Sequence, residues 1–182
     1  MTLEDLGAIL AEQFIPHIMR PDDDDILIAY PMRHYKGSDG QRDLMMRMSI
    51  SENEDLVRFQ AFLDYGLSDV QVESRQMLFR LLLMVSLRVP MVQFEMLSTG
   101  AMFFVVEAPL RDGVLTPEQI GLCIESLIQP VDQYDQDIRN SIRMGVSKLP
   151  MHGMVLHEMM TDLLDIRASE EGESEEDSDE WI

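Results

Sequence analysis

The chain has 182 residues, of which 46% are hydrophobic and 26% are charged, and its formal net charge is -20. This length and composition allow one domain with its own core and an appendage. The acidity disfavours direct binding to nucleic acids or anionic membranes, and no apolar run reaches the ~18 to 20 residues that cross a bilayer.

The amino-terminal segment is predicted to be a helix. Thr2 and Asp5 have the spacing of a helix cap, in which the hydroxyl accepts a hydrogen bond from a free amide. Apolar residues follow at helical spacing, namely Leu3, Leu6, Ile9, Leu10, Phe14 and Ile18. Pro16 should end or kink this helix. Because Glu4 and Asp5 stand where a secretory signal would be basic, we expect a cytoplasmic protein.

Three strands are predicted after an acidic linker. The aspartate run 22–25 is interpreted as a solvated linker, because calcium loops space their ligands at alternate positions. Apolar residues then alternate with polar ones over residues 26–32, 44–50 and 57–63, with turns at 37–40 and 51–55. A period of two with short connections predicts three consecutive antiparallel strands.

The second half of the chain adds helices and a hairpin. Residues 73–87 form a predicted helix that is apolar almost all round, which is typical of a helix buried in the core or at a subunit interface. Strands are predicted at 91–97 and 102–108, and the second has apolar residues on both faces. Thr116, Pro117 and Gln119 mark the start of another helix, which continues to about Ile138.

The predicted fold class is α+β, with helices packed on one face of an antiparallel sheet. The element order is α-β-β-β-α-β-β-α, followed by a C-terminal helix at about 151–166, so that the domain covers residues 1–168. Residues 169–182 include eight acidic side chains and few apolar ones. We therefore expect them to be a disordered acidic tail.

The hairpin at 92–108 and the capped helix start that follows it are the features that carry a family resemblance. Together with the element order, they resemble the YbjN-like family, which is similar in fold to the type III secretion chaperones. The residues of that helix start are Asp112-Gly113-Val114-Leu115-Thr116-Pro117-Glu118-Gln119. The resemblance covers about residues 2–140. It implies an adaptor, regulatory or chaperone-like role, usually as a homodimer, and offers no catalytic residues to transfer.

Five residues are candidates for binding a protein partner. Arg33, Arg47 and Arg58 are each out of phase with the apolar positions of their strands, so they could share the sheet face opposite the helices and bind carboxylates. The alternative is a solvated face on which local acids balance them. Trp181 and Ile182 end the acidic tail, where a tryptophan is a favoured binding residue. The alternative is a solubility tail with an incidental end.

No catalytic, metal-binding or cofactor-binding residue is predicted. His152 and His157 are five residues apart and miss the four-residue spacing of ligands on one helix face. Cys123 is the only cysteine and is interpreted as a buried apolar residue. We predict a non-catalytic protein-binding module that forms a homodimer. The alternatives are an acidic regulator that binds a basic protein by mimicking nucleic acid, and an unrecognised metal-dependent enzyme.

Overall fold

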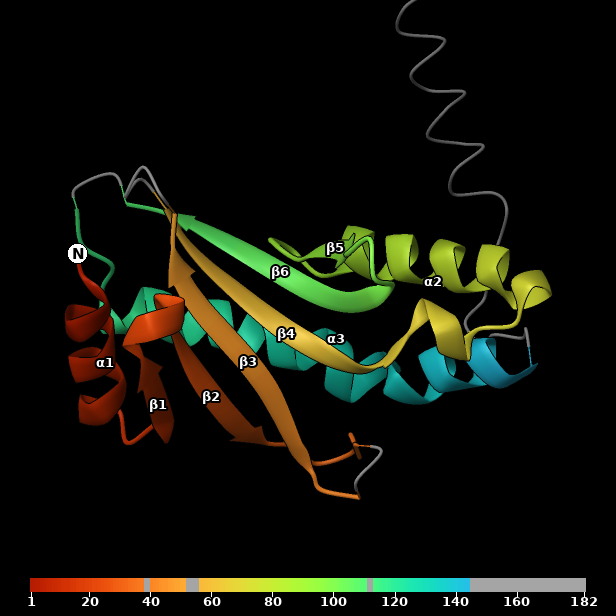
Figure 1. The fold of residues 1–182 in the computed structure, drawn as a ribbon, viewed down its shortest axis with the longest axis horizontal. Coiled ribbons are helices and arrows are strands. Elements are labelled where there is room, and N and C mark those ends of the chain that lie inside the picture. Colours follow the sequence, from red (N-terminus) through yellow and green to blue (C-terminus); the bar gives the residue numbers. More distant parts are fainter. Residues whose placement is uncertain (38–39, 52–55, 111–112, 145–182) are drawn as a thin grey trace, which may run out of the picture. The chain divides into compact units, whose positions relative to one another are not determined.

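The computed structural model describes residues 1–37, 40–51, 56–110 and 113–144, which form a six-stranded antiparallel sheet with three α-helices (Figure 1). The sheet order is β1-β2-β3-β4-β6-β5. The elements are α1 (Leu3–Glu12), β1 (His17–Arg20), β2 (Asp25–Pro31), β3 (Asp43–Ile50), β4 (Leu56–Gly66), α2 (Arg75–Arg88), β5 (Gln93–Met96), β6 (Ala101–Pro109) and α3 (Pro117–Met144). The predicted α+β class is confirmed. The predicted helix at 151–166 and the tail at 169–182 lie outside the described residues.

Among the described residues, β1 is the one strand that the sequence pattern did not predict. The first helix was expected to end or kink at Pro16, with Ile18 on its apolar face, but α1 already ends at Glu12. Phe14 then adopts a left-handed backbone conformation, with φ of 55°, and turns the chain. Because Pro16 also disfavours a helical conformation at the preceding residue, the chain leaves the helix and pairs with β2.

Both predicted helix caps are present. The Thr2 hydroxyl accepts a hydrogen bond from the Asp5 amide, and the Asp5 carboxylate accepts one from the Thr2 amide. The same reciprocal pair joins Thr116 and Gln119 at the start of α3. These bonds satisfy amides that a helix end leaves without intrahelical partners.

The hydrophobic core lies on one face of the sheet. Two cross-strand rows of fully or almost fully buried residues run through β2, β3, β4 and β6, namely Ile26, Met48, Phe59 and Val106, and Ile28, Met46, Ala61 and Phe104. Helix α1 packs on β1 and β2, while α3 packs on β4 and β6 and crosses behind the strands in Figure 1. No helix of the described residues is long and apolar enough to cross a bilayer.

Strand β6 is buried on both faces, as its sequence predicted. Phe104 and Val106 point to the core, and Phe103 and Val105 point to the other face, yet all four are buried. On that second face the Phe103 ring lies 6.1 Å from the Phe62 ring, centroid to centroid. The sheet face without helices is therefore partly apolar.

Candidate functional site

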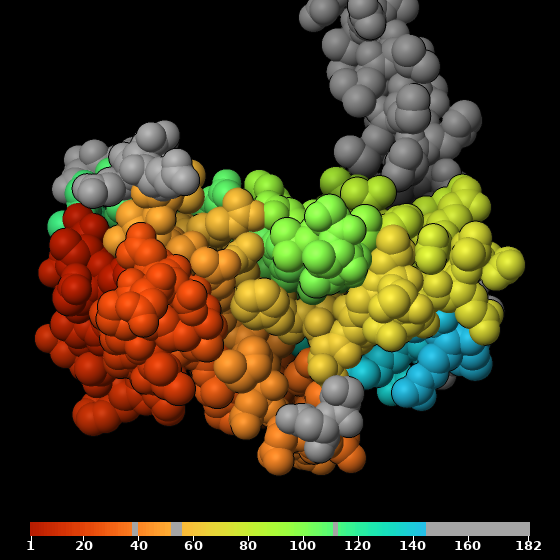
Figure 2. Space-filling model, viewed as in Figure 1, coloured from red at the N-terminus to blue at the C-terminus, as the bar shows by residue number. Residues whose placement is uncertain are grey.

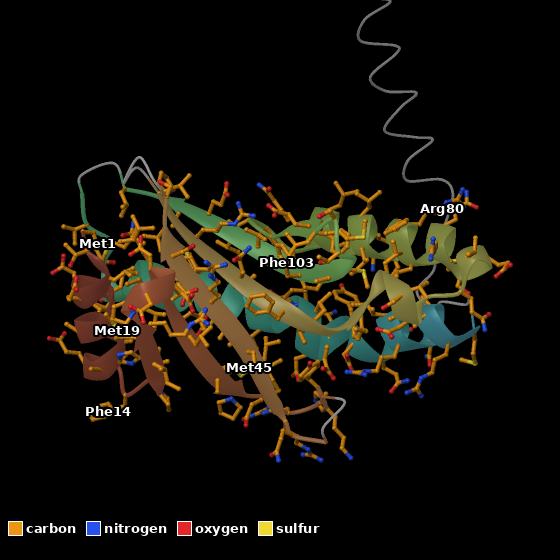
Figure 3. All side chains as sticks on the ribbon, in the orientation of Figure 1. Met1, Phe14, Met19, Met45, Arg80 and Phe103 are labelled. Atoms are coloured by element: carbon orange, nitrogen blue, oxygen red, sulfur yellow. The ribbon has the colours of Figure 1, made fainter. Side chains whose placement is uncertain are left out.

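The sheet face opposite the core carries no α-helix among the described elements, and Figures 1 and 2 look onto it. The strand register arranges its side chains in rows. A polar row contains Arg20, Asp25, Ser49, Arg58 and Glu107, and a mixed row contains Ile18, Leu27, Arg47, Gln60 and Val105. Met45 and Phe103 lie on the same face in Figure 3. This face therefore combines paired charges with apolar surface.

Asp25 is the centre of the first charge cluster. Its side chain is completely buried, and the two nitrogens of Arg20 that contact it lie 2.8 Å and 2.6 Å from its two carboxylate oxygens. The Nε atom of Arg47 lies 2.6 Å from Oδ2 of Asp25, but it is not aligned for a hydrogen bond. Burial of a carboxylate is costly unless it is paired, so the two arginines make this position possible. The expectation of a solvated linker was wrong at Asp25, because it begins β2 between them.

Arg58 forms a second cluster across β4, β5 and β6. Its Nη1 donates a hydrogen bond of 3.0 Å to Glu107, and its Nη2 donates one to Glu95. All three side chains are about one-third exposed, so water screens the pairs and each contributes little to stability. Two carboxylates therefore already hold the guanidinium of Arg58.

The structure brings together two of the three arginines that the sequence singled out. Arg47 and Arg58 lie on the helix-free face, on neighbouring strands. Arg33 does not, because β2 ends at Pro31 and Arg33 is exposed in the bend that follows. Trp181 and Ile182 lie outside the described residues. The acid contacts of Arg47 and Arg58 match the interpretation of a locally balanced face.

Helix α2 has an exposed apolar stripe that the sequence pattern could not locate. One side of the helix is buried against α3 and β5 through Leu78, Leu81, Leu82 and Val85. On the other side Leu83 and Leu87 are 58% and 63% exposed, one helical turn apart. Arg80 and Arg88 lie beside them on the surface, and Arg80 extends from α2 away from the sheet in Figure 3. Residues 75–88 contain three arginines and no acidic residue, whereas the whole chain has a net charge of -20.

A groove of about 830 Å³ lies between the end of β2 and the middle of α3. Tyr30 and His34 line it from the β2 side, and Glu125, Ile128 and Asp132 line it from α3. The backbone amide of His34 donates a 2.8 Å hydrogen bond to Asp132 and joins the two sides. The groove is thus a formed surface with acidic and apolar walls.

Arg139 ties the second half of α3 to the sheet. Its Nε lies 2.9 Å from both carboxylate oxygens of Asp135, and its Nη2 donates a hydrogen bond to the Lys36 carbonyl. The guanidinium also lies 5.6 Å and 5.2 Å from the ring centroids of Tyr35 and Tyr65. Burial raises the pKa of Asp135, and it raises the pKa of Tyr35 to about 12. This cluster fixes one end of the groove.

The described residues offer no arrangement with evident catalytic chemistry. Among them, no group of three or more histidine, cysteine or acidic side chains is placed to hold a metal ion. The Cys123 thiol is buried, and burial raises its pKa to about 11, so little thiolate exists near neutral pH. The charged clusters described above are ion pairs within the fold.

Comparison with known proteins adds no relative: no family model, curated protein or solved structure matches this chain.

Proposed function

We propose that this protein is a non-catalytic, chaperone-like adaptor that works by binding other polypeptides and that forms a homodimer through α2. The observation that carries the proposal is the two-sided apolar character of α2. Its inner side already fills the core, so Leu83 and Leu87 are not needed there and instead face outward. Exposed apolar patches rimmed by polar residues are typical of protein–protein interfaces.

In the proposed homodimer, the α2 helix of a second copy covers this surface. Leucines one turn apart form a self-complementary ridge, as a two-fold interface requires. Arg80 and Arg88 flank the ridge and carry no neighbouring acid within α2, whereas most of the chain is acidic. In a two-fold interface the leucine ridges of the two copies face one another, and the arginines are paired by acidic residues of the second copy that lie outside α2. Association would also bury the exposed part of each leucine, where a complete leucine burial contributes about 1.5 to 3 kcal/mol.

The proposal is tested by the mass of the full-length protein in sedimentation equilibrium. We expect a particle of twice the 20.9 kDa chain mass at micromolar concentration. The double substitution Leu83→Gln and Leu87→Gln should raise the dimer dissociation constant at least about tenfold, which corresponds to ~1.4 kcal/mol. Because both residues are already exposed, the folded monomer should remain stable.

The matched control replaces exposed apolar residues elsewhere on the surface. Val114 and Leu122 are 64% and 53% exposed and lie outside α2. Val114→Gln with Leu122→Gln should leave the dissociation constant within about twofold, because these residues are not part of the proposed interface. Wild-type protein that stays monomeric at high micromolar concentration would refute the homodimer. Equal weakening by both double variants would refute α2 as its interface.

A further inference from the structure

The groove between β2 and α3 is lined by acidic side chains and by no lysine or arginine among the described residues. Residues Glu125, Ile128 and Asp132 follow one another at helical spacing on α3, so they form one wall. Asp135 also lines the groove, but Arg139 neutralises it at 2.9 Å. The charges left without a basic partner among these lining residues are therefore those of Glu125 and Asp132.

These two carboxylates differ in how they are held. The exposed Glu125 has no hydrogen bond or ion pair to any described residue, so its carboxylate is available to a ligand. Asp132 is half-buried, and one of its oxygens accepts the amide hydrogen of His34 at 2.8 Å. This contact fixes the direction of the Asp132 carboxylate and leaves its other oxygen as an acceptor.

Beside the carboxylates the groove has an aromatic and aliphatic surface. Tyr30 and Ile128 are both half-buried and line opposite sides. A long basic side chain matches such a surface, because its methylene stem packs on apolar groups while its charged end reaches the acids. A guanidinium can in addition stack on the face of a tyrosine ring.

We propose that this groove binds a positively charged segment of a partner protein, with an arginine or lysine side chain held by Glu125 and Asp132 beside Tyr30. This inference rests on the proposed protein-binding function and names the chemistry of one partner. It uses a surface different from α2, so a dimer can present two such grooves. The acidity of the whole chain speeds the encounter with a basic segment, and the groove supplies the specific contacts.

The test measures fluorescence anisotropy of a labelled peptide of glycine, serine and leucine that carries several arginines. A matched peptide has citrulline in place of arginine, which keeps the shape and removes the charge. We expect full-length wild-type protein to bind the arginine peptide at least about tenfold more tightly at about 0.15 M salt. The double variant Glu125→Gln, Asp132→Asn should lose at least about tenfold in affinity.

These substitutions are chosen to keep the fold. In Asp132→Asn the carbonyl oxygen of the new side-chain amide can still accept the His34 amide hydrogen, and Glu125 is exposed. If the double variant nevertheless unfolds, Glu125→Gln alone should lose at least about threefold in affinity, because one of two charge contacts is removed.

The control is Glu4→Gln with Glu73→Gln, two exposed acids that do not line the groove. This variant changes the net charge by the same amount and should stay within about twofold of wild type. Equal weakening by the groove and control variants would overturn the proposal, since net charge alone would then attract the peptide. Failure of the wild-type protein to distinguish arginine from citrulline would also overturn it. Neither result affects the proposed homodimer, which is measured at α2 without any peptide.

Discussion

The Nε atom of Arg47 on β3 lies 2.6 Å from Oδ2 of Asp25 on β2, so an arginine that was a candidate for binding a partner is paired with an acid of the neighbouring strand. Arg20 on β1 holds the same carboxylate by two hydrogen bonds. The three first strands of the sheet are thus joined by one buried acid. This relationship makes Asp25 a structural residue.

Replacing Asp25 should destabilise the fold. In Asp25→Ala the buried carboxylate and its hydrogen bonds are lost, and we expect a decrease of about 2 kcal/mol in the free energy of unfolding. The arginines remain partly exposed and can reach water, which keeps the loss below that of a fully buried pair. Asp22→Ala, in the same run but at an exposed position, should stay within about 0.5 kcal/mol. Equal effects of the two substitutions in urea unfolding would contradict a structural role for Asp25.

Removing Arg139 should leave Asp135 buried without its partner. We expect Arg139→Met to lower the free energy of unfolding by about 3 kcal/mol at pH 7. Arg143→Met, at an exposed position in the last turn of α3, should have little effect.

The loss in unfolding free energy caused by Arg139→Met, called the deficit below, should also depend on pH. Burial raises the pKa of Asp135 above its ordinary 3.8, so the stability linked to its protonated form is lost as the pH rises through the folded-state pKa. Without Arg139 the Asp135 carboxylate is protonated more readily. The loss in unfolding free energy caused by Arg139→Met should therefore shrink as the pH is lowered toward the folded-state pKa of Asp135. A deficit that does not shrink as the pH is lowered from 7 would contradict an unpaired Asp135 as its cause.

The Cys123 thiol should be unreactive in the folded protein. Its pKa is raised from 9.0 to about 11 by burial, so the thiolate fraction at pH 8 falls by roughly a hundredfold. Reaction with a disulfide reagent should therefore be at least about a hundredfold slower than in urea-unfolded protein. Because the folded pKa is raised, stability linked to the neutral thiol should persist below pH 9 and decrease as the pH approaches 11. Rapid labelling of folded protein at pH 8 would mean that Cys123 is accessible.

Trp181 is predicted to contribute affinity that the acidic residues around it cannot. Truncation of a buried tryptophan at an interface costs ~2 kcal/mol or more, whereas exposed charge pairs contribute ~0 to 1 kcal/mol each. Trp181→Ala should therefore weaken capture of a tail-dependent partner at least about tenfold. A chain ending at residue 168 should bind as weakly and keep its free energy of unfolding within about 1 kcal/mol. If Trp181→Ala captures that partner as well as wild type while the truncated chain does not, the tip is incidental.

The fold class could be predicted from sequence because it depends on local patterns. The alternation of apolar and polar residues at 44–50 and the helix cap at Thr116 each depend only on residues that are close in sequence. Asp25 was misinterpreted because its burial depends on the register of β1, β2 and β3, which no single segment contains. The bend at Arg33 likewise removed that residue from the sheet face on which it was expected.

The candidate surfaces were harder to predict than the fold. Apolar residues occupy almost the whole circumference of the helix at 73–87, so the sequence does not indicate that the core leaves Leu83 and Leu87 exposed. The groove combines Tyr30 with Glu125, residues from β2 and α3 that are far apart in the sequence. Neither surface had a local motif.

The dipolar coupling between spin labels on the α2 helices of two copies tests the proposed homodimer most directly. Gln76→Cys introduces an exposed thiol on α2 and keeps both leucines of the proposed interface, while the buried Cys123 should remain unlabelled. If two α2 helices pack with their axes about 8 to 10 Å apart, labels at position 76 should show dipolar coupling between copies. Labels introduced at Glu4, which is exposed on α1, should show much weaker coupling. Absence of coupling at position 76 at high micromolar concentration, or equal coupling at both positions, would contradict dimerisation through α2.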